Sequence, residues 1–93
     1  MPDLGEQTMR VSKTSSPQKL GSAIFHGLTK QPHHPVVLRA IGAGAVNQAV
    51  KGLAIANGFL GVNGRSASFK VGFETVSGEQ QDVSAMVFRA NCD

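Results

Sequence analysis

The sequence predicts an α/β (α+β) two-layer sandwich with the element order β-α-β-α-β-β. Two stretches with apolar residues at helical spacing each lie between strand-like stretches, and the last two strand-like stretches flank a short polar turn. A helix that connects two strands favours a parallel pair, whereas a short turn makes the pair antiparallel. We therefore expect a mixed four-stranded sheet with both helices on one face and the other face open.

The chain has the length and composition of one small domain. It holds 93 residues, of which 41% are hydrophobic, with neither Trp nor Tyr, so the expected core is aliphatic and rich in Ala. Residues 1–7 are predicted to form a flexible tail and residues 8–91 the single domain. A chain this small buries a limited share of its surface, which favours a homodimer or a higher homo-oligomer.

The first two elements are a strand and a helix. Residues 8–13, "TMRVSK", alternate apolar and polar side chains, as a strand with one covered face does. In "SSP", Ser16 is the expected N-cap and Pro17 fits the first helical position, where its missing N–H has no consequence. Apolar residues follow at helical spacing, and the helix is expected to end near Lys30.

The next two elements are a buried strand and a second helix. Residues 36–41, "VVLRAI", form an almost continuous apolar run interrupted by Arg39. The "GAG" segment ends that strand, and the second helix is expected to begin at Gly44. Gly58 is expected to weaken the end of this helix, and residues 61–64, "GVNG", are predicted to form a turn.

The remaining residues predict an antiparallel hairpin. Residues 66–76, "SASFKVGFETV", place Phe69, Val71 and Phe73 on one face of a strand. The polar "SGEQQ" segment then turns the chain, and residues 82–90, "DVSAMVFRA", form the last strand.

Charge is distributed unevenly along the chain. The net charge is +3, yet from Gln7 to Phe73 the sequence contains eight Lys or Arg residues and no acid. A surface of one sign attracts polyanions and accelerates their association, although a basic charge of this size is also enough simply to keep a protein soluble.

Cysteine usage and hydropathy indicate where in the cell the protein is expected. Cys92 is the single cysteine, so no internal disulfide is possible, which favours a reducing environment. The first residues lack the apolar core of a signal peptide, and no run of about 18 apolar residues suggests a membrane span. We expect a cytoplasmic protein without membrane contact.

The "GAGAVN" segment resembles a phosphate-binding turn at a helix N-terminus. It lacks the third glycine of the dinucleotide fingerprint, because Asn47 stands there, and no carboxylate follows at the distance needed to hold a ribose. A nucleotide-binding enzyme that uses Gly42 and Gly44 is therefore the weaker alternative. The favoured interpretation is that these glycines turn the chain and let a helix lie close to a strand.

Residues 40–60, "AIGAGAVNQAVKGLAIANGFL", closely resemble the most characteristic segment of the stage V sporulation protein S family. The preceding "VSKTSSPQKLGSAI" is similar to the opening of that family, and the resemblance extends from Met9 to Arg89. It implies a fold similar to that of the Alba chromatin proteins, which typically bind DNA or RNA as dimers. It also implies a regulatory role in bacterial development or cell division.

The resemblance assigns nucleic-acid contacts to the loop after the first strand, which here implies Lys13 and, at the start of the following helix, Lys19. Two positions depart from the related proteins. Asn57 stands where the sporulation family often has a basic residue, and the "SGEQQD" hairpin is acidic where Alba hairpins are often basic. Groove contact by the hairpin is therefore not expected.

Further binding candidates follow from the residue pattern. Lys51 shares a polar helix stripe with Asn47 and Gln48, although the favoured role of the Asn47 amide is to bond the backbone of the glycine turn. Strand alternation places Arg39 opposite the better apolar set, and Arg10 and Lys70 are expected to project in the same way. The same face is also suited to subunit packing.

Metal binding and catalysis have little support in the sequence. His33 and His34 are adjacent, so their side chains diverge, and no nearby Cys or third His completes a ligand set. No acid lies near a histidine in sequence, and Cys92 is expected in a frayed terminus, where it is a poor nucleophile. We expect a non-enzymatic nucleic-acid-binding protein without metal or cofactor; a structural protein–protein interaction module is the other alternative.

Overall fold

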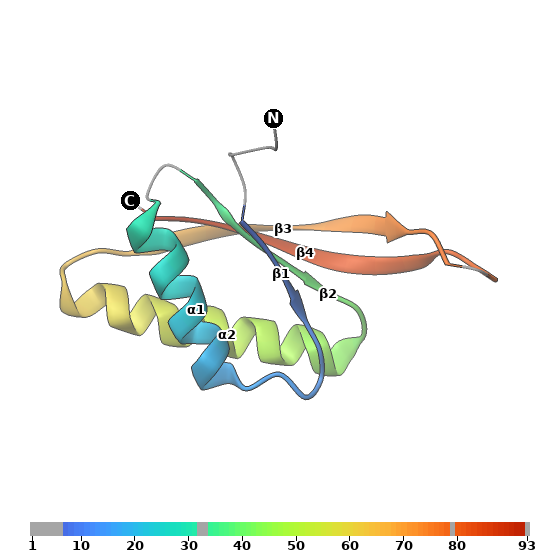
Figure 1. The fold of residues 1–93 in the computed structure, drawn as a ribbon, viewed down its shortest axis with the longest axis horizontal. Coiled ribbons are helices and arrows are strands. Elements are labelled where there is room, and N and C mark those ends of the chain that lie inside the picture. Colours follow the sequence, from blue (N-terminus) through green and yellow to red (C-terminus); the bar gives the residue numbers. More distant parts are fainter. Residues whose placement is uncertain (1–6, 32–33, 79, 93) are drawn as a thin grey trace.

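The computed structural model describes residues 7–31, 34–78 and 80–92. The predicted element order is confirmed (Figure 1). The six elements are β1 (Gln7–Val11), α1 (Pro17–Lys30), β2 (Val36–Ala40), α2 (Ala43–Val62), β3 (Ala67–Val76) and β4 (Val83–Cys92).

The four strands form one mixed sheet in the order β1-β2-β4-β3. β1 and β2 are parallel, as expected for strands joined by a helix, and β3 and β4 form the expected antiparallel hairpin. β4 lies between β2 and β3 and is antiparallel to both. The chain therefore passes through α2 to the edge strand β3 before β4 returns to the centre of the sheet.

Both helices lie on one face of the sheet and enclose an aliphatic core (Figure 1). The largest fully buried side chains come from both layers and are Ile24, Leu28, Val36, Leu38 and Leu60. The helices approach each other closely at Gly52 of α2, where an added Cβ would lie 2.8 Å from both Cγ and Cδ2 of Leu20 in α1. The core thus depends on a glycine at the helix contact.

The start of α1 follows the predicted capping pattern. The Ser16 hydroxyl accepts a hydrogen bond from the backbone N–H of Lys19 at 3.3 Å, and Pro17 occupies the first helical turn. The preceding strand is shifted from its predicted bounds, because β1 ends at Val11 and not at Lys13. Ser12 begins a turn instead, in which its backbone N–H donates to the Ser15 hydroxyl at 2.9 Å.

The predicted end of α2 is wrong. The helix begins one residue early and continues through Gly58 and Gly61 to Val62, where a turn was expected. An interior glycine destabilises a helix by only about 1 kcal/mol relative to alanine, and the buried stripe of α2 continues as far as Leu60. Core packing at that end outweighs the weak helix propensity of the two glycines.

The C-terminal strand is also longer than predicted, because it runs to Cys92 and does not fray after residue 90. Cys92 is half-buried, pairs in register with Ala67 of β3 and packs against the core. Pairing with the ten-residue edge strand β3 extends the ladder beyond the last strongly apolar residues of the sequence.

Candidate nucleic-acid interface

The sheet face opposite the helices carries the basic side chains of the strands. Val36, Leu38 and Ala40 of β2 lie in the core under the helices, so the alternate residues Val37 and Arg39 project from the other face. The register then places Arg10, Val87, Arg89, Lys70 and Gly72 on that open face as well. The expected orientation of Arg10, Arg39 and Lys70 agrees with this arrangement.

Two rows of residues cross the open face. One row runs from Arg10 through Arg39 and Val87 to Gly72, and the second from Thr8 through Val37 and Arg89 to Lys70. The rows lie two residues apart, which is about 6.6 Å along a strand. Each strand therefore contributes one cation, and together the four form a diagonal basic band, which consists of Arg10, Arg39, Arg89 and Lys70.

Glu74 places one acid beside the diagonal basic band. Its Oε1 accepts from Nη2 of Arg39 at 2.7 Å, with both side chains more than a third exposed. An ion pair at such an exposed position stabilises the fold only slightly and serves mainly to orient the guanidinium. The Nε of Arg39 is shielded from solvent and has no hydrogen-bond partner among the described residues.

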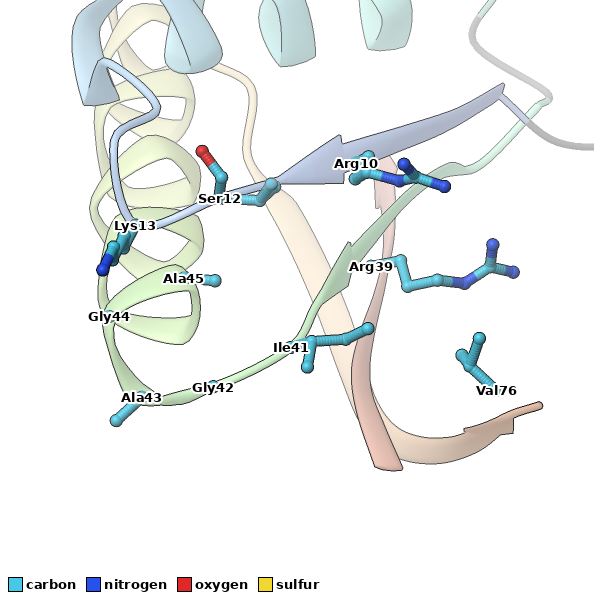
Figure 2. A pocket seen from close by; sticks show the side chains of 11 residues that line it. Arg10, Ser12, Lys13, Arg39, Ile41, Gly42, Ala43, Gly44, Ala45 and Val76 are labelled. Atoms are coloured by element: carbon cyan, nitrogen blue, oxygen red, sulfur yellow. The ribbon is translucent and has the colours of Figure 1, made fainter. Parts of the chain in front are cut away.

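A cavity of about 690 Å³ lies where the open face meets the start of α2 (Figure 2). We call it the sheet-end cavity; its lining residues are Arg10, Val11, Ser12, Lys13, Arg39, Ile41, Gly42, Ala43, Gly44, Ala45 and Val76. Five of the residues predicted to form the site thus meet around one hollow. In Figure 2 the side chains of Arg10 and Arg39 extend to the same side, whereas Lys13 points away from them.

The glycine turn positions the wall of this cavity, as the favoured interpretation expected. Gly42 has a φ of 92°, a conformation that only glycine adopts readily. At Gly44 an added Cβ would lie 2.8 Å from the Cβ of Lys13, so this glycine lets the loop after β1 rest on the start of α2. Both glycines therefore have a structural role.

The polar stripe of α2 fixes the loop that carries Lys13. Gln48 donates from Nε2 to the carbonyl oxygen of Ser15 at 2.8 Å, across 33 residues of sequence. Asn47 donates from Nδ2 to Oε1 of Gln48 at 3.1 Å. The amide of Asn47 thus supports a neighbouring side chain rather than the glycine backbone that was one of its two expected partners.

The other predicted cations lie apart from the sheet-end cavity. Lys19 and Lys51 are exposed on α1 and α2, and neither lines the cavity. Lys70 lines a second, shallower hollow on the open face, together with Arg89 and Glu74. The structure thus brings Arg10, Lys13 and Arg39 together and leaves Lys19, Lys51 and Lys70 elsewhere.

Arg89 and Glu74 are the site residues that the sequence analysis missed. The alternation of β4 places Arg89 opposite the buried Phe88 and Ala90, by the same rule that singled out Arg39. That signal was present in the sequence. The contact between Glu74 and Arg39 required the sheet order, because β4 separates their strands.

Metal and membrane sites find no support in the part of the chain that the structure describes. Within residues 7–31, 34–78 and 80–92, no three His, Cys, Asp or Glu side chains gather as a metal site would require. His33 lies outside the described residues, and His34 contacts Gln31 through Nδ1 and Oε1 at 2.9 Å. Across the same ranges, every helix is too short or too polar to span a bilayer.

The fold and the open face together define a small basic protein with an Alba-like fold. Its fold is similar to that of Alba from Thermoplasma volcanium, with a TM-score of 0.61 and 12% sequence identity over 94% of this chain and 99% of that chain. At this identity the likeness shows the fold alone. Residues 7–93 match the family model of stage V sporulation protein S, and the chain belongs to that family.

Proposed function

We propose that this protein is a non-enzymatic nucleic-acid-binding regulator that holds the phosphate backbone of DNA or RNA on the diagonal basic band. The observation that carries the proposal is the register, which aligns one cation from each strand across an open face with a single described acid beside them. Membership of a sporulation family and the Alba fold support a regulatory role of this kind.

Phosphate contacts are expected to supply most of the affinity. The small apolar residues Val37 and Val87 lie between the cations of the band, whereas Phe69 and Phe73 lie on the opposite face of the sheet. Bases therefore have no aromatic platform on the band on which to stack. Binding should accordingly be sensitive to salt and nearly insensitive to sequence.

The size of the band sets the expected salt dependence. If its four cations neutralise about four phosphates of duplex DNA, the slope of log K against log salt should be near −3.6. Affinity should then fall about 150-fold for a fourfold rise in salt. Fluorescence anisotropy with duplex DNA, single-stranded DNA and RNA, each at several salt concentrations, measures this slope.

Variants test whether the band is the surface in use. Lys70→Ala is expected to reduce the magnitude of the slope by about one unit for each copy in contact. It should weaken binding to all sequences by about the same factor. Lys30→Ala, which removes an exposed lysine at the end of α1, is the matched control and should leave the slope unchanged. If Lys13→Ala and Lys51→Ala lower the slope whereas Lys70→Ala does not, nucleic acid binds at the loop and α2, and the proposed surface is wrong.

A second function, as a protein–protein interaction module, rests on a different observation. Several apolar side chains of β3 are exposed on the helix side of the sheet, where a partner protein would cover them. We take a second copy of the chain as the first candidate for that partner.

A further inference from the structure

The sheet-end cavity combines features that the diagonal basic band alone does not have. Its walls are mostly apolar and include Ile41, Ala45 and Val76, while Arg10 and Arg39 supply two guanidinium groups on one side. Its volume of about 690 Å³ lies in the range of small-molecule sites, which are mostly apolar with a few convergent polar groups. A phosphodiester backbone can bind to an open basic surface and does not require a cavity of this kind.

The two guanidiniums suit a phosphate group of high charge. Arg10 and Arg39 are register partners on adjacent parallel strands, so their Cα atoms are about 4.8 Å apart. Glu74 holds Nη2 of Arg39, and the Nε of Arg39 is shielded from solvent, so Nη1 of Arg39 and the guanidinium of Arg10 are the groups left for a ligand. Arginine guanidiniums donate charge-assisted hydrogen bonds to phosphate, and the acid beside them, Glu74, is held by Arg39 and does not itself line the cavity.

We propose that the sheet-end cavity binds the phosphomonoester of a nucleoside, with the phosphate on Arg10 and Arg39 and the nucleoside against the apolar wall. This site differs from the nucleotide site that the glycine turn suggested, because cations of β1 and β2 hold the phosphate. The positive end of α2 adds to the potential in the cavity without being needed as a ligand. The phosphomonoester is either a free mononucleotide or the phosphorylated end of a nucleic-acid strand.

Binding of a phosphomonoester in the cavity should also compete with binding of a nucleic-acid strand on the diagonal basic band. Arg10 and Arg39 belong both to the cavity and to the diagonal basic band, so a ligand in the cavity would engage two of the four cations of the band. This competition rests on the proposed function, whereas the cavity site itself does not.

Binding is tested by titrating the ¹⁵N-labelled full chain with AMP, adenosine and inorganic phosphate. AMP should bind saturably and shift the backbone amides of Gly42 and Gly44, and adenosine should bind at least about tenfold more weakly because it lacks the charge-assisted bonds. A dinucleotide with a 5′-phosphate that displaces AMP, when its 5′-hydroxyl form does not, identifies a strand end. A phosphorylated dinucleotide that fails to displace AMP identifies the free nucleotide.

Two variants that each remove one positive charge from the open face separate the cavity from the band. Arg10→Gln should weaken AMP binding by about tenfold or more, whereas Lys70→Gln, which lies outside the cavity, should leave it within about twofold. Both variants should weaken the binding of duplex DNA if the proposed function holds. Any of three results would overturn the cavity proposal, whatever the DNA result. These are no saturable AMP binding at millimolar concentration, adenosine binding as tightly as AMP, and an equal loss of AMP affinity in the two variants.

Discussion

At the scale of single residues, Glu74 is the group that most directly lowers the positive charge of the open face. It is one of only two acids in the described residues and is paired with Arg39, whereas the other, Asp82, lies in the exposed turn of the hairpin. An acid beside a polyanion site repels the ligand and also occupies part of a guanidinium. If the diagonal basic band binds nucleic acid as proposed, Glu74 should therefore limit its affinity while it orients Arg39.

Glu74→Gln is expected to strengthen nucleic-acid binding about three- to tenfold at low salt, because it removes one negative charge and releases Arg39. The free energy of unfolding should fall by less than about 1 kcal/mol, the usual contribution of an exposed ion pair. Anisotropy and urea denaturation measure the two effects. Asp82→Asn is the control, and an equal gain in both variants would show that only net charge matters.

Residue positions show how far the sequence could predict the site. Alternation within single strands was enough to place Arg10, Arg39 and Lys70 on one face, because the side-chain period of a strand is fixed. It could not show that Arg10 and Arg39 are neighbours or that Glu74 reaches Arg39, because register and strand order depend on tertiary pairing. Nor could it show that Gly44 makes room for Lys13.

At the scale of elements, the contact between α1 and α2 depends on small residues. Gly52 faces Leu20 so closely that a methyl group would overlap the leucine side chain, whereas nothing lies within 4 Å of a Cβ added at Gly58 in the same helix. The two glycines are therefore a matched pair, one constrained by packing and one not. The sequence showed both as weak helix formers and did not distinguish them.

Gly52→Ala should lower the free energy of unfolding by about 1–3 kcal/mol, because the overpacked helices must move apart. Gly58→Ala should instead raise it by up to about 1 kcal/mol, since alanine is the better helix former and meets no neighbour. Urea denaturation followed by circular dichroism measures both. Stabilisation by both substitutions would mean that the helices separate without penalty and that the close contact is unimportant.

At the scale of the whole molecule, the helices do not cover the full sheet. Phe73 is 80% exposed and Val71 52%, on the face of β3 that continues the core beyond the helices, and Val50 of α2 is also exposed. A homo-oligomer was expected from the limited surface that a chain of this size buries. The structure places a large exposed apolar set on β3, because α1 and α2 lie over the other three strands (Figure 1).

We predict that the protein forms a homodimer through this apolar part of β3, because exposed patches of this kind usually bind a partner. Sedimentation at micromolar concentration should find a dimer or a larger assembly, and Phe73→Asp should yield a folded monomer. Val62→Asp is the control, since Val62 is equally exposed but lies at the far end of α2. A wild-type monomer, or dissociation by both substitutions alike, would contradict this prediction.

The central position of β4 also determines when the sheet forms during synthesis. β1, β2 and β3 are all translated before β4, yet β3 has no sheet partner except β4. Until residues 83–92 have left the ribosome, the nascent chain can form at most the β1–β2 pair and the two helices. During that time β3 has no strand to pair with. Because the long-range β2–β4 pairing closes last, the sheet should form only after residue 92 has left the ribosome, and more slowly than a helical bundle of equal length folds. A nascent chain stalled before residue 83 should therefore be cleaved rapidly by a protease in pulse proteolysis, and one extended by a linker past residue 92 should be resistant.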